Sequence, residues 1–372
     1  MATAPRLVPR PKVWAAEVAG PEIEADDVRL VQQKVWGYRQ GQLVTTMMHL
    51  GDRLGIYRAM QGAGPLTAAE LALASGLHER WLLEWLRSQA AAGLIESPDG
   101  ESFELTAAAG EVLANDAALT FAGSALSPPR GPEVIDRLAE SFKTGIGLTY
   151  DDLGPGEADH VERAFGNWTA HTLVPRFVPA VDGLAGRLTA GARVADVGCG
   201  TGLALRLLAA EYPNSDFSGF ELSQHAIDKA VENAAADGVA IDFHNVTETS
   251  LGDKAPFDVV LTLDCLHDMT RPDDVAADIH ASLADDGVWL VKEIRSTPDF
   301  TQNRKNPLLA MMYATSVSVC LSSAMSEPDG AGYGTLGLNP EALRDLVTTA
   351  GFTSIERHEF DDPINLYYSI TK

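Results

Sequence analysis

The chain has 372 residues, 45% of them hydrophobic, and carries 28 Lys and Arg against 52 Asp and Glu. That length suggests two domains, since a domain usually has about 150 residues. The net charge of −24 repels phosphate backbones and anionic lipid surfaces. No stretch approaches the ~18 uninterrupted apolar residues of a membrane span. The composition is therefore typical of a soluble globular protein and disfavours nucleic-acid and membrane partners.

The cysteines and the N-terminus bear on the compartment. Cys199, Cys265 and Cys320 lie far apart, without CxxC or CxxH spacing. They provide neither a zinc ligand set nor a disulfide framework, so we predict no metal site and a reducing, cytoplasmic environment. Residues 1–27 contain basic residues but no apolar signal-peptide core, and we interpret them as a Pro-rich arm.

Residues 28–116 have the pattern of a helical and winged-helix domain. Apolar residues recur at helical spacing through residues 28–60, which predicts one or two long buried helices. Thr67 and Glu70 form a capping box that begins a short helix, and HERWLLEWLRSQAAAG predicts the next helix. Two short strands about a Pro-Asp-Gly turn follow. Helix, turn, helix and hairpin is the order of a winged helix.

The charge of this segment argues against DNA binding. Residues 66–106 contain two Arg against seven Asp and Glu. The helix that would enter the major groove has an apolar face, which suits packing or dimerisation better and is formed by Trp81, Leu82, Leu83, Trp85 and Leu86. We therefore predict no nucleic-acid partner and a homodimer formed through the N-terminal helices.

The rest of the chain divides into a helical linker or cap, residues 117–190, and a larger domain, residues 191–372. In the larger domain short apolar strands alternate with helical segments, at the spacing of a parallel sheet. Two strands around Asp361-Asp362-Pro363 predict an antiparallel C-terminal hairpin. The fold class is therefore α/β: a Rossmann-like doubly wound sheet with that hairpin, preceded by a mostly helical winged-helix and dimerisation domain.

The insert at residues 295–340 is too long for an ordinary connection. Its chain position places it over the carboxyl edge of the sheet. Its Met-rich helical part is interpreted either as a lid over an apolar substrate or as an additional packing helix.

The sequence VADVGCGTG, residues 194–202, follows the first predicted strand. A dinucleotide fingerprint G-x-G-x-x-G beginning at residue 198 would need Gly at 203, where the chain has Leu. The D-x-G-x-G-x-G form instead resembles motif I of class I S-adenosylmethionine (SAM) methyltransferases. The resemblance implies that Asp196 orients the cofactor's ammonium group and that the loop binds SAM. The predicted loop contacts are Gly198, Cys199 and Gly200; the alternative is a plain tight turn.

A ligand that contains a ribose also calls for an acidic residue at the tip of the second strand, about 20 residues downstream. Glu221 ends DFSGFE at that position, and we predict that Glu221 and the adjacent Leu222 contact the cofactor. The third strand lacks the Asp that often binds the adenine amino group in this family. We therefore expect Val246 and Thr247 to contact adenine.

The fourth strand, within FDVVLTLDCLHDM, leaves the sheet at its carboxyl edge, where open α/β sheets bind ligands. Asp264 and Cys265 are expected beside the SAM sulfonium. The LHD triplet is similar to the place where small-molecule O-methyltransferases keep their catalytic His. The resemblance implies that His267 removes the proton of a hydroxyl acceptor. The alternative is a helix-start histidine bonded to the backbone.

We predict three acceptor contacts: Trp168, His171 and Met312. Phe165-Gly166-Asn167-Trp168 resembles the helix that caps the SAM pocket in O-methyltransferases, and Met312 lies in the insert. The alternative reading of each is an ordinary packing or surface residue.

Most of the chain resembles bacterial class I methyltransferases with an N-terminal winged helix, of a mycobacterial type. The shared motifs are VADVGCG at 194–200, CLHDM at 265–269, NPLLAMMY at 306–313 and INLYY at 364–368. The resemblance implies SAM-dependent methyl transfer to a small molecule, at a hydroxyl oxygen. Two alternatives stay open: a SAM- or metabolite-sensing winged-helix regulator, and a SAM-binding enzyme of other chemistry.

Overall fold

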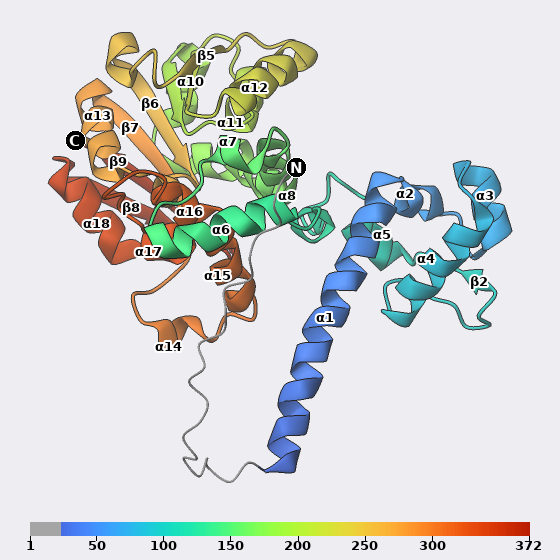
Figure 1. Cartoon of the computed structure of the whole chain (residues 1–372). Helices are drawn as coiled ribbons and strands as arrows, with labels where there is room; N and C mark the ends of the chain where they lie inside the picture. The colour runs from blue at the N-terminus through green and yellow to red at the C-terminus, as the bar shows by residue number, and fades with distance from the viewer. Residues whose placement is uncertain (1–23) are drawn as a thin grey trace, which may run out of the picture.

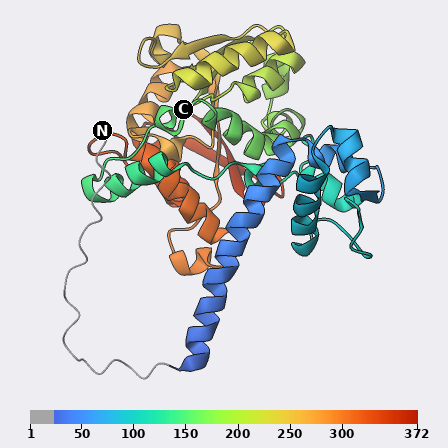
Figure 2. The same ribbon diagram turned by 45° about the vertical axis from the view of Figure 1, so that its right-hand side comes forward.

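The computed structural model describes residues 24–372, which form two lobes connected near the end of one long helix (Figures 1 and 2). Of the predicted N-terminal arm, residues 1–23 lie outside the described part of the chain. No helix between residues 24 and 372 combines the length and the apolar character of a bilayer span.

The smaller lobe contains the predicted winged helix. Its elements are α1 (Ala25–Arg53), α2 (Ile56–Met60), β1 (Leu66–Thr67), α3 (Ala68–Ser75), α4 (Glu79–Ala91), β2 (Ser102–Phe103) and α5 (Ala107–Leu113). The capping box at the start of α3 is present as predicted. The predicted hairpin is reduced to one bridge between Glu96 and Glu104, and β2 pairs instead with β1. A strand of two residues leaves no alternating pattern, so the sequence did not indicate β1.

Helix α4 buries one face in the core of this lobe. Leu82, Trp85 and Leu86 are buried, whereas Trp81 is 79% exposed. The Trp85 indole N–H donates to the carbonyl oxygen of Met47 on α1 over 2.8 Å, which ties the two helices together. The apolar face of α4 therefore packs in the core of this lobe, and Trp81 is left on the surface.

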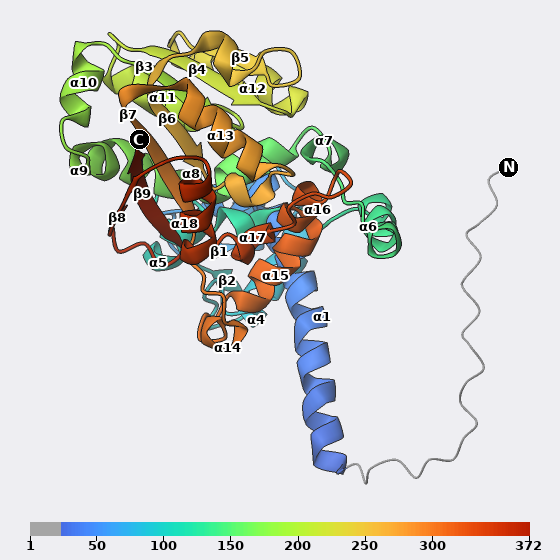
Figure 3. The same ribbon diagram turned by 90° about the vertical axis from the view of Figure 1, so that its left-hand side faces the viewer.

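The prediction that residues 28–60 are buried is wrong for the first part of α1. Val28, Val31, Val35 and Trp36 are each more than half exposed. Figures 1 and 3 show this part of the helix standing clear of both lobes, so no other described segment covers it. Burial begins near Met48, where the helix reaches the core of the smaller lobe.

A set of helices links the lobes: η1 (Gly123–Leu126), α6 (Pro132–Thr144), α7 (Tyr150–Leu153), α8 (Glu157–Thr172), η2 (Leu173–Phe177), α9 (Val178–Ala180) and α10 (Leu184–Ala190). Helix α8 carries the main polar junction. The Arg163 guanidinium donates to both carboxylate oxygens of Asp52 on α1, at 2.6 and 2.7 Å. Asp52 is only 9% exposed, so this bidentate pair joins the lobes at a partly dry contact.

The larger lobe is built on a seven-stranded sheet in the order β5-β4-β3-β6-β7-β9-β8. Its strands are β3 (Arg193–Val197), β4 (Asp216–Glu221), β5 (Asp242–Asn245), β6 (Phe257–Leu263), β7 (Leu283–Ile294), β8 (Ser354–His358) and β9 (Asn365–Thr371). The first five are parallel, and β9 pairs antiparallel with both β7 and β8. The doubly wound sheet with a closing antiparallel hairpin is confirmed.

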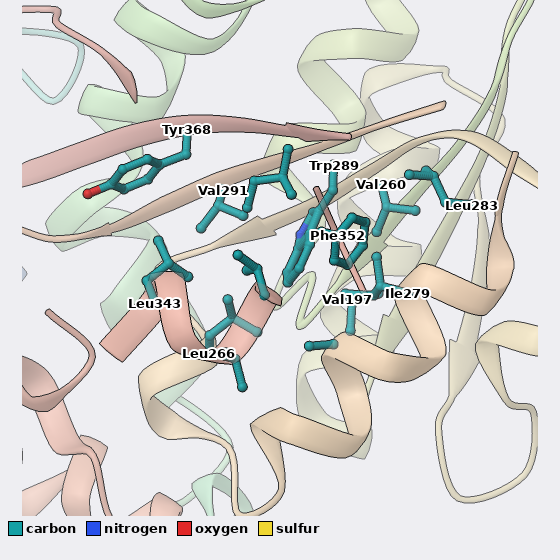
Figure 4. Packing of buried hydrophobic residues seen from close by; sticks show 14 of the residues in the cluster. Val197, Val260, Leu266, Ile279, Leu283, Trp289, Val291, Leu343, Phe352 and Tyr368 are labelled. Carbon is teal, nitrogen blue, oxygen red and sulfur yellow. The ribbon is translucent and has the colours of Figure 1, made fainter. Parts of the chain in front are cut away.

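Apolar side chains cover both faces of this sheet, as parallel strands require. The helices of this lobe that follow β3 in the chain are α11 (Leu203–Glu211), α12 (Gln224–Asp237), η3 (Leu251–Lys254), η4 (Leu266–Asp268), α13 (Pro272–Ser282), α14 (Phe300–Asn303), α15 (Leu309–Ser318), α16 (Cys320–Ala324), α17 (Gly334–Gly337) and α18 (Pro340–Thr349). On one face, fully buried Trp289 packs on Phe352 with ring centroids 5.2 Å apart (Figure 4). This core fixes β6 and β7, whose carboxyl ends carry the polar residues described next.

Candidate active site

A cavity of about 1470 Å³ lies at the carboxyl edge of the parallel strands. The loop after β3, the tips of β4 and β6, α7, α8 and the insert at residues 295–340 all contribute to its wall. Pockets for one drug-sized ligand have volumes of about 300–1,000 Å³. This cavity therefore has room for two ligands side by side.

The loop after β3 requires its glycines. Gly198, Gly200 and Gly202 have φ of 74°, 53° and 78°, a left-handed conformation that other residues rarely adopt. At Gly198 a Cβ atom would also lie 2.9 Å from the Cys265 side chain. The backbone can therefore come close to a ligand at Gly198, Cys199 and Gly200, all three of which line the cavity.

Glu221, at the tip of β4, holds this loop in place. Its carboxylate accepts hydrogen bonds from the backbone N–H of Gly200 at 2.9 Å, of Leu222 at 2.8 Å and of Ser223 at 2.9 Å. Burial raises the pKa of Glu221, and these three bonds oppose the rise. A carboxylate has about four acceptor sites, so Glu221 keeps capacity for about one ligand hydroxyl group in the cavity.

Asp196 is a buried carboxylate on the cavity wall that fits a cationic group. It is 2% exposed, and within residues 24–372 its Oδ1 atom has no hydrogen-bond partner. Burial and the charge of Glu221 raise the pKa of Asp196 to about 7. A bound ammonium group would satisfy Oδ1 and restore the ionised carboxylate. The residues present thus fit the amino acid part of SAM.

Only one of the two residues predicted to contact adenine, Val246 and Thr247, lines the cavity. Val246 lines the cavity and is 40% exposed. Thr247 does not line it, because its Oγ1 donates to Asn245 Oδ1 at 2.7 Å within the turn after β5. The structure brings Leu222 and Val246 to the cavity wall with the rest of the predicted cofactor residues, and leaves Thr247 outside.

His267 on η4 lies on the cavity wall and is 3% exposed. Its Nδ1 atom lies 2.6 Å from Glu293 Oε2, and its Nε2 atom lies 3.2 Å from Asp268 Oδ1. The ring thus faces carboxylates rather than the backbone. Sequence reasoning missed Glu293, the penultimate residue of β7; an acidic residue soon after the apolar stretch 288–291 was the available signal.

The charge around His267 sets its protonation. Burial alone would lower the pKa of the imidazole, but the carboxylates of Glu293 and Asp268 outweigh burial and raise that pKa well above its ordinary value. The protonated form is therefore favoured when no cation is near. A positive ligand beside the ring would oppose the carboxylates and favour the neutral imidazole.

One cluster has donor atoms suited to a metal ion. Side-chain donor atoms of His267, Asp268 and Cys320 lie within 4.8 Å of one another, and no other such group occurs in the described range. Hydrogen bonds already hold two of them: Glu293 holds His267, and Tyr150 holds Asp268. We therefore interpret the cluster as an acid–base centre.

Asp264 and Cys265 lie at the tip of β6 and line the cavity, as expected. Asp264 has a φ of 57° and its Oδ2 atom lies 2.6 Å from Nζ of Lys292, whose side chain is 4% exposed. The Cys265 thiol donates to the carbonyl oxygen of Val197 at 3.1 Å. Lys292, which the sequence analysis did not select, largely neutralises the Asp264 carboxylate.

Of the three predicted acceptor contacts, only Met312 lines the cavity. Trp168 and His171 do not, and the His171 ring is exposed with Nδ1 2.8 Å from the carbonyl oxygen of Asn167. Helix α8 presents Phe165 and Thr169 to the cavity instead, since residues four apart share a helix face. The insert forms the opposite apolar wall, with Leu308, Leu309, Met311, Met312, Val319 and Leu336.

Comparison with known proteins agrees with this geometry. Residues 195–289 match the family described as "Methyltransferase domain". Residues 195–289 are a methyltransferase domain. The segment 42–115, in front of it, matches the family described as "Rv2258c-like winged HTH domain". The methyltransferase domain thus follows a winged helix, as the sequence resemblance implied.

Relatives and solved structures extend the comparison. The ubiquinone biosynthesis O-methyltransferase of Roseobacter denitrificans is 25% identical over 171 residues, which cover 46% of this chain and 63% of that protein. The structure of the mitomycin 7-O-methyltransferase MmcR matches with a TM-score of 0.65 and 19% identity, covering 94% of this chain and 100% of its own. Human N-acetylserotonin methyltransferase in complex with SAM matches with a TM-score of 0.65 and 16% identity, covering 95% and 99%. The two structures share the fold of both lobes.

Proposed function

We propose that the protein transfers a methyl group from SAM to a hydroxyl oxygen of a small molecule. The observation that carries this proposal is the buried His267–Glu293 pair in the same cavity as the glycine loop and Glu221. The relatives named above that methylate oxygen support the same chemistry. SAM supplies a methyl group on a positively charged sulfur.

Residues at the ends of β3 and β4 hold SAM in one half of the cavity, the cofactor half. Glu221 accepts a hydrogen bond from a ribose hydroxyl, and Asp196 binds the ammonium group through Oδ1, which has no partner within residues 24–372. The backbone at Gly198, Cys199 and Gly200 follows the amino acid part, and Val246 covers the adenine. Asp264 and Cys265 separate this half from the acceptor half.

The acceptor lies between His267 and the apolar wall of the insert. That wall and α8 exclude water and orient the hydroxyl oxygen towards the methyl carbon. SAM would supply the methyl group, with its sulfur leaving as a neutral thioether, and Nε2 of His267 would take the hydroxyl proton of the acceptor. Glu293 accepts a hydrogen bond from Nδ1–H throughout, so it fixes the ring and stabilises the imidazolium that results.

Methyl transfer tests the proposal directly. Purified protein and SAM are incubated with a panel of phenols, catechols and hydroxylated quinones, and methylated product is detected by mass spectrometry. His267→Asn should lower turnover by about 10²–10⁴-fold and leave SAM affinity unchanged, while the matched control His171→Asn should behave like the unchanged protein. A His267→Asn variant that keeps most of the rate on the best acceptor contradicts the general-base role.

The exposed part of α1 supports a homodimer. Val28, Val31 and Val35 recur every three or four residues on one side of the helix and are each more than half exposed. A second copy of the chain would cover this stripe. Val31→Glu with Val35→Glu should convert the dimer to a monomer in light scattering; a protein that is already monomeric contradicts the assembly.

The compartment proposed for this reaction is the cytoplasm. The three thiols of Cys199, Cys265 and Cys320 are all free in the structure, as expected in a reducing environment. Fractionation of cells that express the full chain would test this, and secretion of the chain would contradict it.

A further inference from the structure

Helix α7 reaches into the centre of the cavity from the segment between the lobes. The residues just before it are fixed to the insert: the backbone N–H of Gly147 donates to the carbonyl oxygen of Met325 at 2.8 Å, and that of Leu148 to Ser322 Oγ at 2.7 Å. A side chain at Gly147 would collide with the backbone of Ser322. These contacts place the first residue of α7, Tyr150, at a defined position beside η4.

Tyr150 contacts the acid–base centre through Asp268. Its hydroxyl donates to Asp268 Oδ2 at 2.5 Å. The other oxygen, Oδ1, lies 3.2 Å from His267 Nε2 but has no hydrogen-bond partner within the described residues. Asp268 therefore acts on the imidazole through its charge, and Tyr150 sets where that charge lies.

We propose that Tyr150 is a positioning residue of the methyl-transfer reaction: it holds Asp268 and disperses its charge, so that His267 can receive the acceptor's proton. This inference rests on the proposed function and adds a residue that no sequence motif pointed to. Tyr150 itself does not take part in proton transfer from the acceptor. It acts through Asp268.

The groups around His267 show why one hydrogen bond matters. Glu293 from β7 and Asp268 from η4 both favour the protonated ring, Cys320 from α16 lies beside it, and Tyr150 from α7 stands behind Asp268. Asp268 Oδ1 lies 3.2 Å from Nε2, the atom that must accept the proton. If the phenol hydrogen bond is lost, the full Asp268 charge acts on Nε2 and the neutral ring becomes scarcer.

The same helix touches the cofactor half. Asp151, the next residue of α7, accepts a hydrogen bond from Ser223 Oγ, and Ser223 in turn donates its backbone N–H to Glu221. Helix α7 is therefore held at both ends of the cavity. A change at the Tyr150 hydroxyl alone leaves these anchors intact, which makes Tyr150→Phe a clean perturbation.

The test follows His267 directly, with the full chain labelled with ¹⁵N-histidine and the His267 signals assigned by loss in His267→Asn. In Tyr150→Phe the apparent pKa of His267 should rise by about half a pH unit or more. The control Tyr212→Phe, which removes a phenol that does not line the cavity, should leave it unchanged. An unchanged His267 pKa in Tyr150→Phe overturns the inference.

A double-mutant cycle checks the route. Asp268→Asn should lower the pKa of His267, and adding Tyr150→Phe to it should then have no further effect on that pKa, because Tyr150 acts through Asp268. If Tyr150→Phe folds poorly, Asp268→Asn alone still tests the contact, because it changes the other partner of the hydrogen bond. A Tyr150→Phe effect that persists in the Asp268→Asn background overturns the inference.

Kinetics separate this inference from the proposed function. In Tyr150→Phe the acid limb of kcat/KM should move to higher pH by the same amount as the NMR pKa, with SAM affinity unchanged. A protein that methylates no acceptor contradicts the proposed function. A protein that does methylate, but whose pH profile is the same with Phe at position 150, contradicts only the inference.

Discussion

Replacing Glu221 is the sharpest test of the cofactor site. The carboxylate accepts three backbone hydrogen bonds, from Gly200, Leu222 and Ser223, and in the proposed complex one more from a ribose hydroxyl. Hydrogen bonds to charged groups contribute about 1.5–3 kcal/mol each. Glu221→Ala removes the ribose contact and frees the loop, so SAM affinity should fall by at least about 1.5–3 kcal/mol, or roughly 10–150-fold.

Glu221→Gln should not rescue binding. One oxygen of the carboxylate accepts from Gly200 and the other from Leu222 and Ser223, so either orientation of an amide places its NH₂ group against a backbone N–H donor. Titration calorimetry with SAM and with its demethylated product measures both variants. Asp216→Asn, an exposed carboxylate at the other end of β4, is the control. A dissociation constant within twofold of the unchanged protein for Glu221→Ala would refute this reasoning.

Three further outcomes follow from the same structure. Because its carboxylate neighbours raise the pKa of His267 above its ordinary value near 6.5, and only the neutral ring accepts a proton, kcat/KM should rise with pH and level off above that raised value; a rate already at its plateau at pH 6 would contradict this. Arg163→Ala leaves the Asp52 carboxylate without its bidentate partner. Because the Arg163 side chain is 31% exposed, the free energy of unfolding should fall by about 2 kcal/mol in chemical denaturation. The control Arg80→Ala, at an exposed ion pair, should change the free energy of unfolding by less than about 0.5 kcal/mol. Gel-shift assays at physiological salt should show no complex with random or promoter DNA, because residues 66–106 carry two Arg against seven acidic residues; a salt-sensitive sub-micromolar complex would favour a regulator instead.

The sequence predicted those parts of the site that depend on local geometry. A glycine loop at a strand end, and an acidic residue at the tip of the next strand, have fixed positions in any sheet of this type. Asp196, Glu221 and Asp264 therefore lie on one cavity wall, as expected. His267 was found because it follows β6 by only a few residues.

The partners of these residues could not be predicted, because they come from distant segments. Glu293 lies 26 positions after His267, and Tyr150 lies 118 positions before Asp268. The residues next to each of them in the sequence do not indicate an active site. Trp168 does not line the cavity for a different reason: the helix was correct, but the face that it presents to the cavity depends on how α8 packs against α11 and α12. Likewise, helical spacing in α1 predicted an apolar stripe but could not show that this chain alone leaves it uncovered.

The two walls of the cavity come from separate stretches of chain. The glycine loop, Glu221 and His267 lie at the carboxyl ends of the sheet strands, whereas the insert between β7 and α18 supplies most of the apolar wall. Natural or laboratory variation in the insert can therefore alter which molecule is accepted while the donor chemistry stays intact. Exchanging residues 306–320 between related chains would be an economical route to catalysts with new acceptor preferences, and the same arrangement would allow paralogues to diverge in substrate within a single lineage.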